Sequence, residues 1–341
     1  MKTKYYNYTL PDELIALEPS PERDACRLLV VDKKTETIEH KVFSNIVDYL
    51  KQGDVLVLND TKVLNARIYA NRQTGAKIEI VLLQSDDFVK WEVLTNRSKR
   101  LKMGDRLQVN DDVFAEIEEV KENGIKILKF NIELTPKLLS EIGEIPLPPY
   151  IKTKRKPDLL DNTWYQTVFS KNYGSKASPT AGLHFTDELL LKLKQKGVII
   201  EYITLHISLS TFNPIRTDDI DDHVMHTEYF EVSEECVQTI LTARKKESRV
   251  FAVGTTVIRA LESAAKQNEL KSLSGYTDLF IKPGYKFKVC DAVITNFHTP
   301  NSTLLVLVSA FAGNELIKKV YKTAIKEKYR FLSYGDSMLI F

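Results

Sequence analysis

Apolar runs alternate with helical patterns through the second half of the chain, and this alternation limits the possible folds more than any other feature. The run 198–207 is rich in β-branched residues and is typical of a strand covered on both faces. A predicted helix at 186–196 precedes it and stops at Gly197. We therefore predict an α/β domain. The expected helices are 186–196, 234–246, 255–266, 302–312 and 314–328, and the expected strands are 198–207, 249–253, 278–281, 292–295 and 337–341.

Residues 62–132 have a different pattern, in which short β-rich runs are separated by close turns. No long helix interrupts these runs, so a small barrel or a sandwich is expected. A helix is predicted at 136–143, and a stiff extended connector at 144–150, because each proline there restrains its own φ and its predecessor. Residues 1–61 have a mixed α/β pattern. The predicted domains are thus 1–61 with 150–341, and an inserted all-β domain at 62–149. The six expected strands of the insert are 63–70, 77–83, 89–94, 106–109, 113–120 and 125–130.

The charge and cysteine content of the chain bear on its partners and on the compartment in which it works. The chain of 341 residues carries 48 Lys and Arg against 46 Asp and Glu, so any RNA contact must come from a local patch. Its three cysteines form no Cys-x-x-Cys pair, which favours neither a disulfide framework nor a zinc cage. No run approaches the length of a membrane span and no secretory leader is evident. We expect a cytoplasmic protein without a membrane partner, and nothing demands more than a monomer.

Polar residues follow several of the predicted strands: 59–61, His206, 254–256 and 295–298. Ligands of α/β folds bind at the carboxyl ends of strands, so these residues are candidates for a common site. Residues 254–256 also open a helix, whose free N–H groups and positive dipole end suit a carboxylate or a phosphate. An ordinary helix cap explains them equally well.

The loop 177–185 consists largely of small residues and leads into a predicted helix N-terminus at Thr186. Its Gly and Pro content suits neither a helix nor a strand interior. Such a loop brings backbone N–H groups close to a ligand. It also carries His184, a candidate for acid/base chemistry.

Two further patterns admit more than one interpretation. His223, His226 and Glu228 could bind a metal, but no His-Glu-x-x-His pattern accompanies them, and acid/base use or hydrogen bonding to a nucleoside fits better. A serine hydrolase lacks support because there is no Gly-x-Ser-x-Gly sequence. The basic clusters 97–102 and 152–156, the second near aromatic residues, could contact RNA or could be solvated loops.

Taken together, ordered segments along nearly the whole chain resemble the S-adenosylmethionine:tRNA ribosyltransferase-isomerase family, which makes epoxyqueuosine in queuosine synthesis. Central among them are Pro179-Thr180-Ala181-Gly182-Leu183-His184-Phe185 and Pro146-Leu147-Pro148-Pro149-Tyr150-Ile151. The other matching segments are 14–16, 23–24, 27–29, 53–63, 66–67, 165–168, 204–206, 225–226 with Glu228, 254–256 with Arg259, 283–285, 295–298, 329–331 and 334–336.

The resemblance implies a barrel-like α/β main domain with an inserted β-barrel. It also implies that the ribosyl part of S-adenosylmethionine moves to the aminomethyl group of 7-aminomethyl-7-deazaguanine at the tRNA wobble position, with loss of adenine and methionine. S-adenosylmethionine is then a co-substrate, tRNA carrying the aminomethyl base is the partner, and no prosthetic group or metal is required. Such a reaction needs a base for the ribose 5′ carbon proton and an acid for the departing adenine. The sulfonium acidifies that carbon, so a weak base suffices.

Site residues carry over from the matching segments. His184 and His206 are the first acid/base candidates, followed by His226, Glu228 and His298. Thr255 and Thr256 are candidates for the methionine carboxylate, and Asp60, Arg67 and Asn296 for nucleoside or tRNA contacts. The remaining substrate-binding candidates are Thr180, Gly182, Thr211, Gly254 and Arg259.

The chain departs from the family pattern at a few positions. Ser208 and Ser210 stand where the family usually has glycines, and Asn65, Thr299 and Asn301 where it usually has Pro, Leu and Lys. A serine where the glycine had positive φ or touched the ligand would crowd the site. Ser208, Ser210 and Asn301 thus motivate one alternative to the transferase-isomerase, a tRNA-binding family member without catalysis. Another alternative, a metal-dependent hydrolase, would use His223 and His226.

Overall fold

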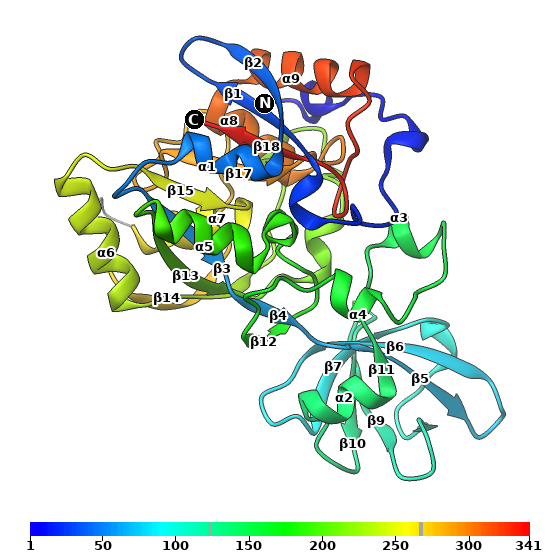
Figure 1. Cartoon of the computed structure of the whole chain (residues 1–341). Helices are drawn as coiled ribbons and strands as arrows, with labels where there is room; N and C mark the ends of the chain where they lie inside the picture. Colours follow the sequence, from blue (N-terminus) through cyan, green and yellow to red (C-terminus); the bar gives the residue numbers. More distant parts are fainter. Residues whose placement is uncertain (123, 266–268) are drawn as a thin grey trace. The chain divides into compact units, whose positions relative to one another are not determined.

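The computed structural model describes residues 1–122, 124–265 and 269–341, and only the backbone of Ser210 and Phe212 (Figure 1). The chain divides into two compact units. The first unit comprises Met1–Lys62, Gln166–Asn172 and Ser178–Phe341, and the second comprises Val63–Tyr165 and Tyr173–Ala177. The second unit therefore includes residues 150–165, which the sequence analysis assigned to the main domain.

Nine strands form one sheet in the first unit: β1 (Arg27–Asp32), β2 (Thr37–Val42), β3 (Val55–Asn59), β13 (Ile199–Leu205), β14 (Glu228–Val232), β15 (Val250–Val253), β16 (Leu273–Thr277), β17 (Ala292–Asn296) and β18 (Ser337–Ile340). Their order is β16-β14-β13-β3-β15-β17-β18-β1-β2. The central strands β13, β3, β15 and β17 run parallel, whereas β18 is antiparallel to β17. Within the described residues no pairing joins the edge strands β16 and β2, so the sheet is open instead of barrel-like. β2 is largely exposed and polar, which suits an edge strand.

The sheet's centre is apolar and the helices around it begin at predictable caps. All five residues of β3 are buried. The Thr186 hydroxyl accepts from the N–H of Leu189 at the start of α5, and the strand that follows is reached through Gly197, whose φ is +84°. No helix among the described residues has the length and apolarity to cross a bilayer. The helices of the first unit are α1 (Ile46–Tyr49), α5 (Asp187–Gln195), α6 (Glu234–Lys245), α7 (Thr255–Ala264), α8 (Thr303–Ala312) and α9 (Asn314–Lys326). Lys266, the predicted end of α7, lies outside the described residues.

One strand prediction fails and another is only partly right. The strand expected at 198–207 forms as β13, but only its second half is buried, and Ile199 is 41% exposed, so it is not covered on both faces throughout. The strand expected at 278–281 is replaced by β16, which ends at Thr277. There the side chain of Arg259 donates to the carbonyls of Thr277 and Leu279, so side-chain hydrogen bonds occupy the backbone where strand pairing was expected.

A closed six-stranded barrel forms the core of the second unit. Strands follow the order β5-β6-β7-β10-β9-β8, and a pairing of β5 with β8 closes the circle. The barrel alternative of the sequence analysis is thus confirmed over the sandwich. The bounds are β5 (Arg67–Arg72), β6 (Lys77–Gln84), β7 (Lys90–Thr95), β8 (Arg106–Gln108), β9 (Phe114–Val120) and β10 (Lys126–Phe130), with β11 (Gly143–Glu144) beside β5.

Short helices accompany the barrel. The α2 helix (Pro136–Ile142) begins at the Thr135 hydroxyl, which accepts from Leu138 N–H. The predicted extended connector 144–150 is wrong at its end, because α3 (Pro149–Lys152) starts there with a proline in its first turn, a position that tolerates the missing donor. The other elements are α4 (Asp161–Trp164) and a two-stranded sheet of β4 (Thr61–Val63) with β12 (Asn172–Ser175).

Candidate active site

Polar side chains gather where the parallel strands of the first unit end. β3 ends at Asn59, β17 ends at Asn296, His206 follows β13 and Gly254 follows β15. Carboxyl ends of parallel strands meet at one edge of the sheet, which is where α/β folds bind ligands. The order of the strands thus brings together residues that are far apart in the sequence, along the edge that Figure 1 shows at β13, β3, β15 and β17.

Asn59 connects three of these segments through its side-chain amide. Its Nδ2 donates to the Leu205 carbonyl at 3.0 Å and to Thr256 Oγ1 at 3.3 Å. Its Oδ1 accepts from the N–H of Leu205 at 3.0 Å and from the N–H of Thr61 at 3.2 Å. The side chain is 1% exposed. Asn59 therefore fixes the end of β13, the start of α7 and the start of β4 relative to one another.

His206 is held at this edge by a hydroxyl and an aromatic ring. Thr61 Oγ1 lies 2.7 Å from His206 Nδ1, and the imidazole stacks on Tyr229 with 5.7 Å between ring centroids. A hydroxyl both donates and accepts, so Thr61 can serve either neutral tautomer of the imidazole. The ring is half-buried. The contact with Thr61 therefore fits either tautomer of the His206 ring.

Asp60 lies beside Asn59 and is fully engaged by neutral donors. Thr204 Oγ1 donates to Asp60 Oδ1 at 2.7 Å, and Asn172 Nδ2 lies 3.0 Å from Oδ2. The residue is 9% exposed. These donors hold the carboxylate in place at the edge of the sheet.

The N-terminus of α7 follows a glycine that no other residue could easily replace. Gly254 has φ +94° and donates its N–H to the Ile294 carbonyl at 2.8 Å. Thr255 and Thr256 are both buried. A Cβ added to Gly254 would lie 3.7 Å from the Ala181 side chain, so the loop 177–185 packs beside this helix start.

Within that loop, Thr180–His184 forms a short 3-10 helix. A Cβ on Gly182 would lie 2.8 Å from the Phe169 ring and 2.9 Å from the Thr167 side chain. The glycine is therefore required for close packing, and Thr180 is half-buried at the helix start. The loop is an ordered wall beside the edge.

His184 has both ring nitrogens occupied, and its neighbours fix its tautomer. Asn296 Nδ2 donates to the Leu332 carbonyl at 3.1 Å, which assigns the amide orientation, and the same Nδ2 lies 3.1 Å from His184 Nε2. Nε2 must then accept, so the proton sits on Nδ1, 3.2 Å from Cys26 Sγ. Burial, with Arg23 and Arg330 adding to it, lowers the pKa of His184 to about 3. His184 is a neutral, fully engaged imidazole that orients Asn296.

His298 is buried in a similar way. Its Nε2 lies 3.1 Å from Thr295 Oγ1, its backbone N–H donates to Tyr321 Oη at 2.9 Å, and Tyr8 donates to its carbonyl. Burial lowers the pKa of His298 to about 3. The structure thus places His298 in the packed layer behind the strand ends.

Acidification is expected to destabilise the first unit through His184 and His298. Their folded pKa values of about 3 lie below the ordinary 6.5, so in this window the unfolded chain binds more protons. The free energy of unfolding then falls as pH drops from about 6.5 toward 3, by about 1 kcal/mol per pH unit per histidine. Urea unfolding followed by far-UV circular dichroism at a series of pH values measures this slope.

The variant His184→Gln tests whether His184 is buried as a neutral imidazole. It removes one of the two histidines that bind a proton on unfolding. Its unfolding free energy should depend less steeply on pH than that of the unaltered chain. His226→Gln, an exposed position, is the matched control and should keep the full slope. Equal slopes in the His184→Gln variant and the unaltered chain would contradict the buried neutral histidine.

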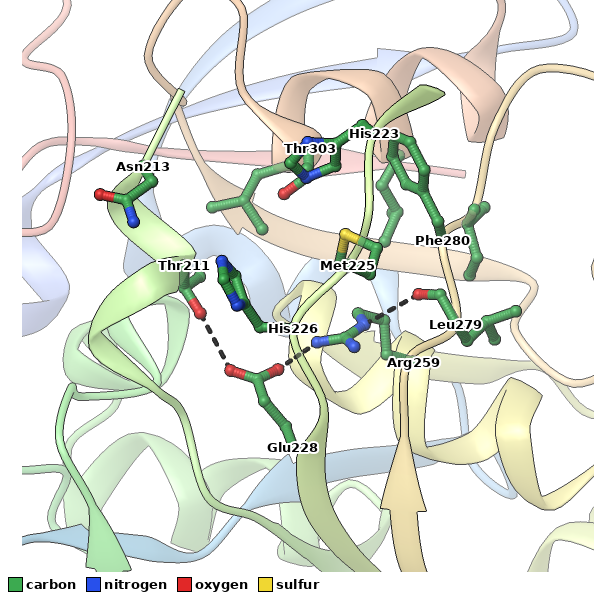
Figure 2. A pocket seen from close by; sticks show the side chains of 13 residues that line it. Thr211, Asn213, His223, Met225, His226, Glu228, Arg259, Leu279, Phe280 and Thr303 are labelled. Carbon is green, nitrogen blue, oxygen red and sulfur yellow. Dashed lines mark hydrogen bonds and ion pairs between the residues drawn. The ribbon is translucent and has the colours of Figure 1, made fainter. Parts of the chain in front are cut away.

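A second group of candidates lines a small pocket of the first unit (Figure 2). Glu228 Oε1 accepts from Thr211 Oγ1 and from the N–H of Ser208, each at 2.9 Å, while Oε2 pairs with Arg259. The side chains of Glu228 and Arg259 are 2% and 6% exposed. Their ion pair anchors β14 to α7 and to the loop after β13. Glu228 is accordingly engaged on both oxygens.

His226 and His223 line the same pocket, His226 as an exposed residue. Burial, followed by the charge of His226, lowers the pKa of His223. Within the ranges that the structure describes, no group of three or more His, Cys, Asp and Glu side chains is placed to hold a metal ion. The pocket is therefore lined by two imidazoles and by the buried ion pair of Glu228 and Arg259.

Arg67 belongs to the second unit, whereas the other candidates belong to the first. It lies in β5, opposite Glu144 of β11, and its Nε is 3.2 Å from Glu79 Oε1. The side chain is 7% exposed. Arg67 thus takes part in the barrel wall.

The departures from the family pattern are accommodated locally. Ser208 is not among the residues with positive φ, so the strain expected from replacing a glycine there does not arise. Asn301 has φ +55°, a region that asparagine tolerates better than most residues, and its Nδ2 contacts Asn7 Oδ1. The side chain of Ser210 lies outside the described part of the chain.

Sequence reasoning passed over several residues that the structure shows to be central. Asn59, Thr61 and Thr204 were noted only as parts of matching or strand-end segments without a role, and Asn172, which with Thr204 holds Asp60, was not noted at all. Asn59 had a detectable signal, because an amide at the end of an otherwise apolar strand is unusual. Asn172 comes from a distant segment, so only the fold reveals it.

A half-buried imidazole, a helix N-terminus and a carboxylate lie at the carboxyl ends of the parallel strands, so the first unit has the ligand-binding arrangement of α/β proteins. Comparison with known proteins gives the family. Residues 3–340 match the family model described as "Queuosine biosynthesis protein". The chain is 50% identical to a protein of Halothermothrix orenii and 48% identical to one of a Sulfurihydrogenibium strain, both named S-adenosylmethionine:tRNA ribosyltransferase-isomerase and both covered completely by the alignment.

A solved structure agrees with these relatives. The crystal structure of S-adenosylmethionine tRNA ribosyltransferase from Thermotoga maritima is 38% identical, with a TM-score of 0.58 over 99% of this chain and 100% of the other. The chain therefore belongs to the S-adenosylmethionine:tRNA ribosyltransferase-isomerase family of tRNA-modifying enzymes in queuosine biosynthesis.

Proposed function

We propose that this chain transfers the ribosyl moiety of S-adenosylmethionine to the aminomethyl group of 7-aminomethyl-7-deazaguanine at the tRNA wobble position. Isomerisation of that moiety gives epoxyqueuosine, and adenine and methionine leave. Full-length identity of about half to relatives that carry this name supports the proposal. The observation that carries it within the structure is the network Thr61–His206 and Asn59–Thr256, which holds an imidazole beside the start of α7.

His206 is the acid/base group in this proposal. The reaction removes a proton from the ribose 5′ carbon beside the sulfonium and supplies a proton or a hydrogen bond to the departing adenine. Thr61 supports either neutral tautomer of His206, which suits a group that first accepts a proton and then returns one. His184 is buried and lies between Asn296 and Cys26, which suits a positioning residue better than a group that exchanges protons with substrate. We therefore rank His206 above His184 and assign His184 to positioning.

The remaining candidates take binding roles. The N–H groups at the start of α7, around Thr255 and Thr256, suit the methionine carboxylate because they carry the positive end of the helix dipole. Asp60 is held in a fixed orientation and can accept from ribose hydroxyls. The pocket above Glu228 and Arg259, with His226 at its side, is a candidate for another polar part of the substrates. Arg67 remains a candidate for RNA contact through the second unit.

The decisive experiment measures adenine release from S-adenosylmethionine with matched tRNA that carries or lacks the aminomethyl base. The proposal expects adenine, methionine and modified tRNA in equal amounts, and only with the aminomethyl base, because its amine is the nucleophile that attacks C1′. Binding of that tRNA without adenine release would instead identify a non-catalytic family member. Release that is independent of the modified base would contradict the proposed substrate.

A further inference from the structure

A groove on the first unit is lined by none of the candidate site residues. It runs between the N-terminal segment, residues 5–9, and the helices α8 and α9, and its volume is about 260 Å³. A cavity of about 150 Å³ accommodates benzene, so this groove has room for a larger flat ring. Tyrosine side chains and aliphatic residues form its walls. The segments identified with the family contribute none of the residues that line it.

Tyr8 and Tyr321, two residues of the groove wall, are held by contacts with each other and with His298. Tyr8 and Tyr321 meet edge to face, with 5.2 Å between ring centroids. Tyr321 accepts from the N–H of His298, and Tyr8 donates to the His298 carbonyl. Burial raises the pKa of both phenols far above the ordinary value, so both stay neutral. Both hydroxyls are hydrogen-bonded to the backbone of His298, so these tyrosines can contact a ligand only through their rings.

The rim of the groove is cationic. Lys318 and Lys322 line it one helical turn apart on α9, and no carboxylate is among its lining residues in the described chain. Lys318 Nζ lies 2.8 Å from Glu315 Oε1 and 5.9 Å from the Tyr5 ring centroid. Glu315 is 87% exposed, so a solvated pair of this kind holds the lysine weakly. Both ammonium groups are thus available to an anion.

One polar group in the groove lacks a partner. Asn314 lines the groove, and its Oδ1 is buried without a hydrogen bond in the described structure. A buried acceptor without a donor costs about 1–3 kcal/mol, which a ligand N–H can recover. Aromatic walls, a cationic rim and an unused acceptor together match a nitrogen-bearing flat ring that has an anionic substituent.

We propose that this groove is a nucleotide-binding site. The base lies against the tyrosine rings, its amino group donates to Asn314 Oδ1, and its phosphate meets Lys318 and Lys322. Aromatic side chains stack with any base, and lysine binds phosphate as a compact charge. A free mononucleotide and a nucleotide of the tRNA share this chemistry. Binding of the former can be measured whether or not the proposed reaction is correct.

The test uses AMP as the probe, with adenosine as its uncharged counterpart, titrated into the full chain and followed by calorimetry. AMP should bind in the millimolar range or better, and more tightly than adenosine. Lys318→Ala/Lys322→Ala should weaken AMP binding about tenfold and adenosine binding much less, since only AMP carries the phosphate. Tyr5→Ala should weaken both ligands about tenfold through lost stacking.

Lys319→Ala is the matched control. Lys319 lies on the same helix but contacts the Glu36 carbonyl, outside the groove, so AMP binding should be unchanged. No AMP binding at millimolar concentration would overturn the proposal. Binding that Tyr5→Ala and the double lysine variant leave intact would overturn it as well, because AMP would then occupy another place.

The steady-state assay distinguishes the two sources of the nucleotide. If the double lysine variant raises KM for tRNA and leaves kcat unchanged, the groove holds a nucleotide of the tRNA. If AMP binding weakens while KM for tRNA stays constant, the groove holds a free mononucleotide. Either result supports the site, and failure of adenine release itself would reject the proposed function without affecting the AMP measurement.

Discussion

Replacing His206 with glutamine is expected to lower kcat for adenine release by about 100- to 10,000-fold, the usual contribution of a positioned acid/base group. Glutamine keeps a polar side chain of similar reach but cannot exchange a proton near neutral pH. KM for S-adenosylmethionine should change much less, because the binding groups around α7 and Asp60 are intact. The pH profile of kcat/KM should also lose the limb that reports the imidazole.

Two further variants separate this role from a structural one. His40→Gln is the matched control. His40 lies on the edge strand β2 and contacts Tyr329, away from the candidate site, so kcat should stay close to that of the unaltered enzyme. Thr61→Val removes the hydroxyl that orients His206 and should lower kcat without abolishing the limb in the pH profile. An unchanged kcat in His206→Gln would eliminate His206 as the acid/base group.

Local patterns predicted the elements of this fold well wherever the hydrogen bonds are local or periodic. The six strands of the barrel were each expected within a few residues, because alternating apolar residues and Gly-containing turns mark a small barrel in the sequence. The N-cap expected at Thr186 is present, and the helix expected from Ser302 begins there as well, since each hydroxyl accepts from an N–H three residues later.

The predictions that failed concern segments whose structure depends on residues far away in the sequence. The strand expected at 278–281 does not form, because the side chain of Arg259, from α7, donates to the carbonyls of Thr277 and Leu279. β14 was not expected, although Glu228 was singled out, because the polar side chains around it carry no clear alternation. The chemical state of His184 was equally hidden. It depends on Asn296, Leu332 and Cys26, three residues that only the fold brings together.

Arg259→Met is expected to lower the free energy of unfolding by about 3–5 kcal/mol, because it leaves the Glu228 carboxylate buried without its cation. The carbonyls of Thr277 and Leu279 lose their donors in the same variant. Urea unfolding followed by far-UV circular dichroism measures the loss. Removing both charges, in Arg259→Met/Glu228→Leu, should recover part of it, since no unpaired charge then remains in the interior.

Arg244→Met is the matched control for the buried pair. Arg244 is 38% exposed on α6 and lies 3.9 Å from Asp291, so its removal should cost at most about 1 kcal/mol. The contrast tests why Glu228 and Arg259 are paired: a buried pair is costly to break because one charge remains, even where the intact pair adds little. Equal losses in Arg259→Met and in the double variant would show that the lost carbonyl contacts, and not the orphaned Glu228 charge, account for the destabilisation.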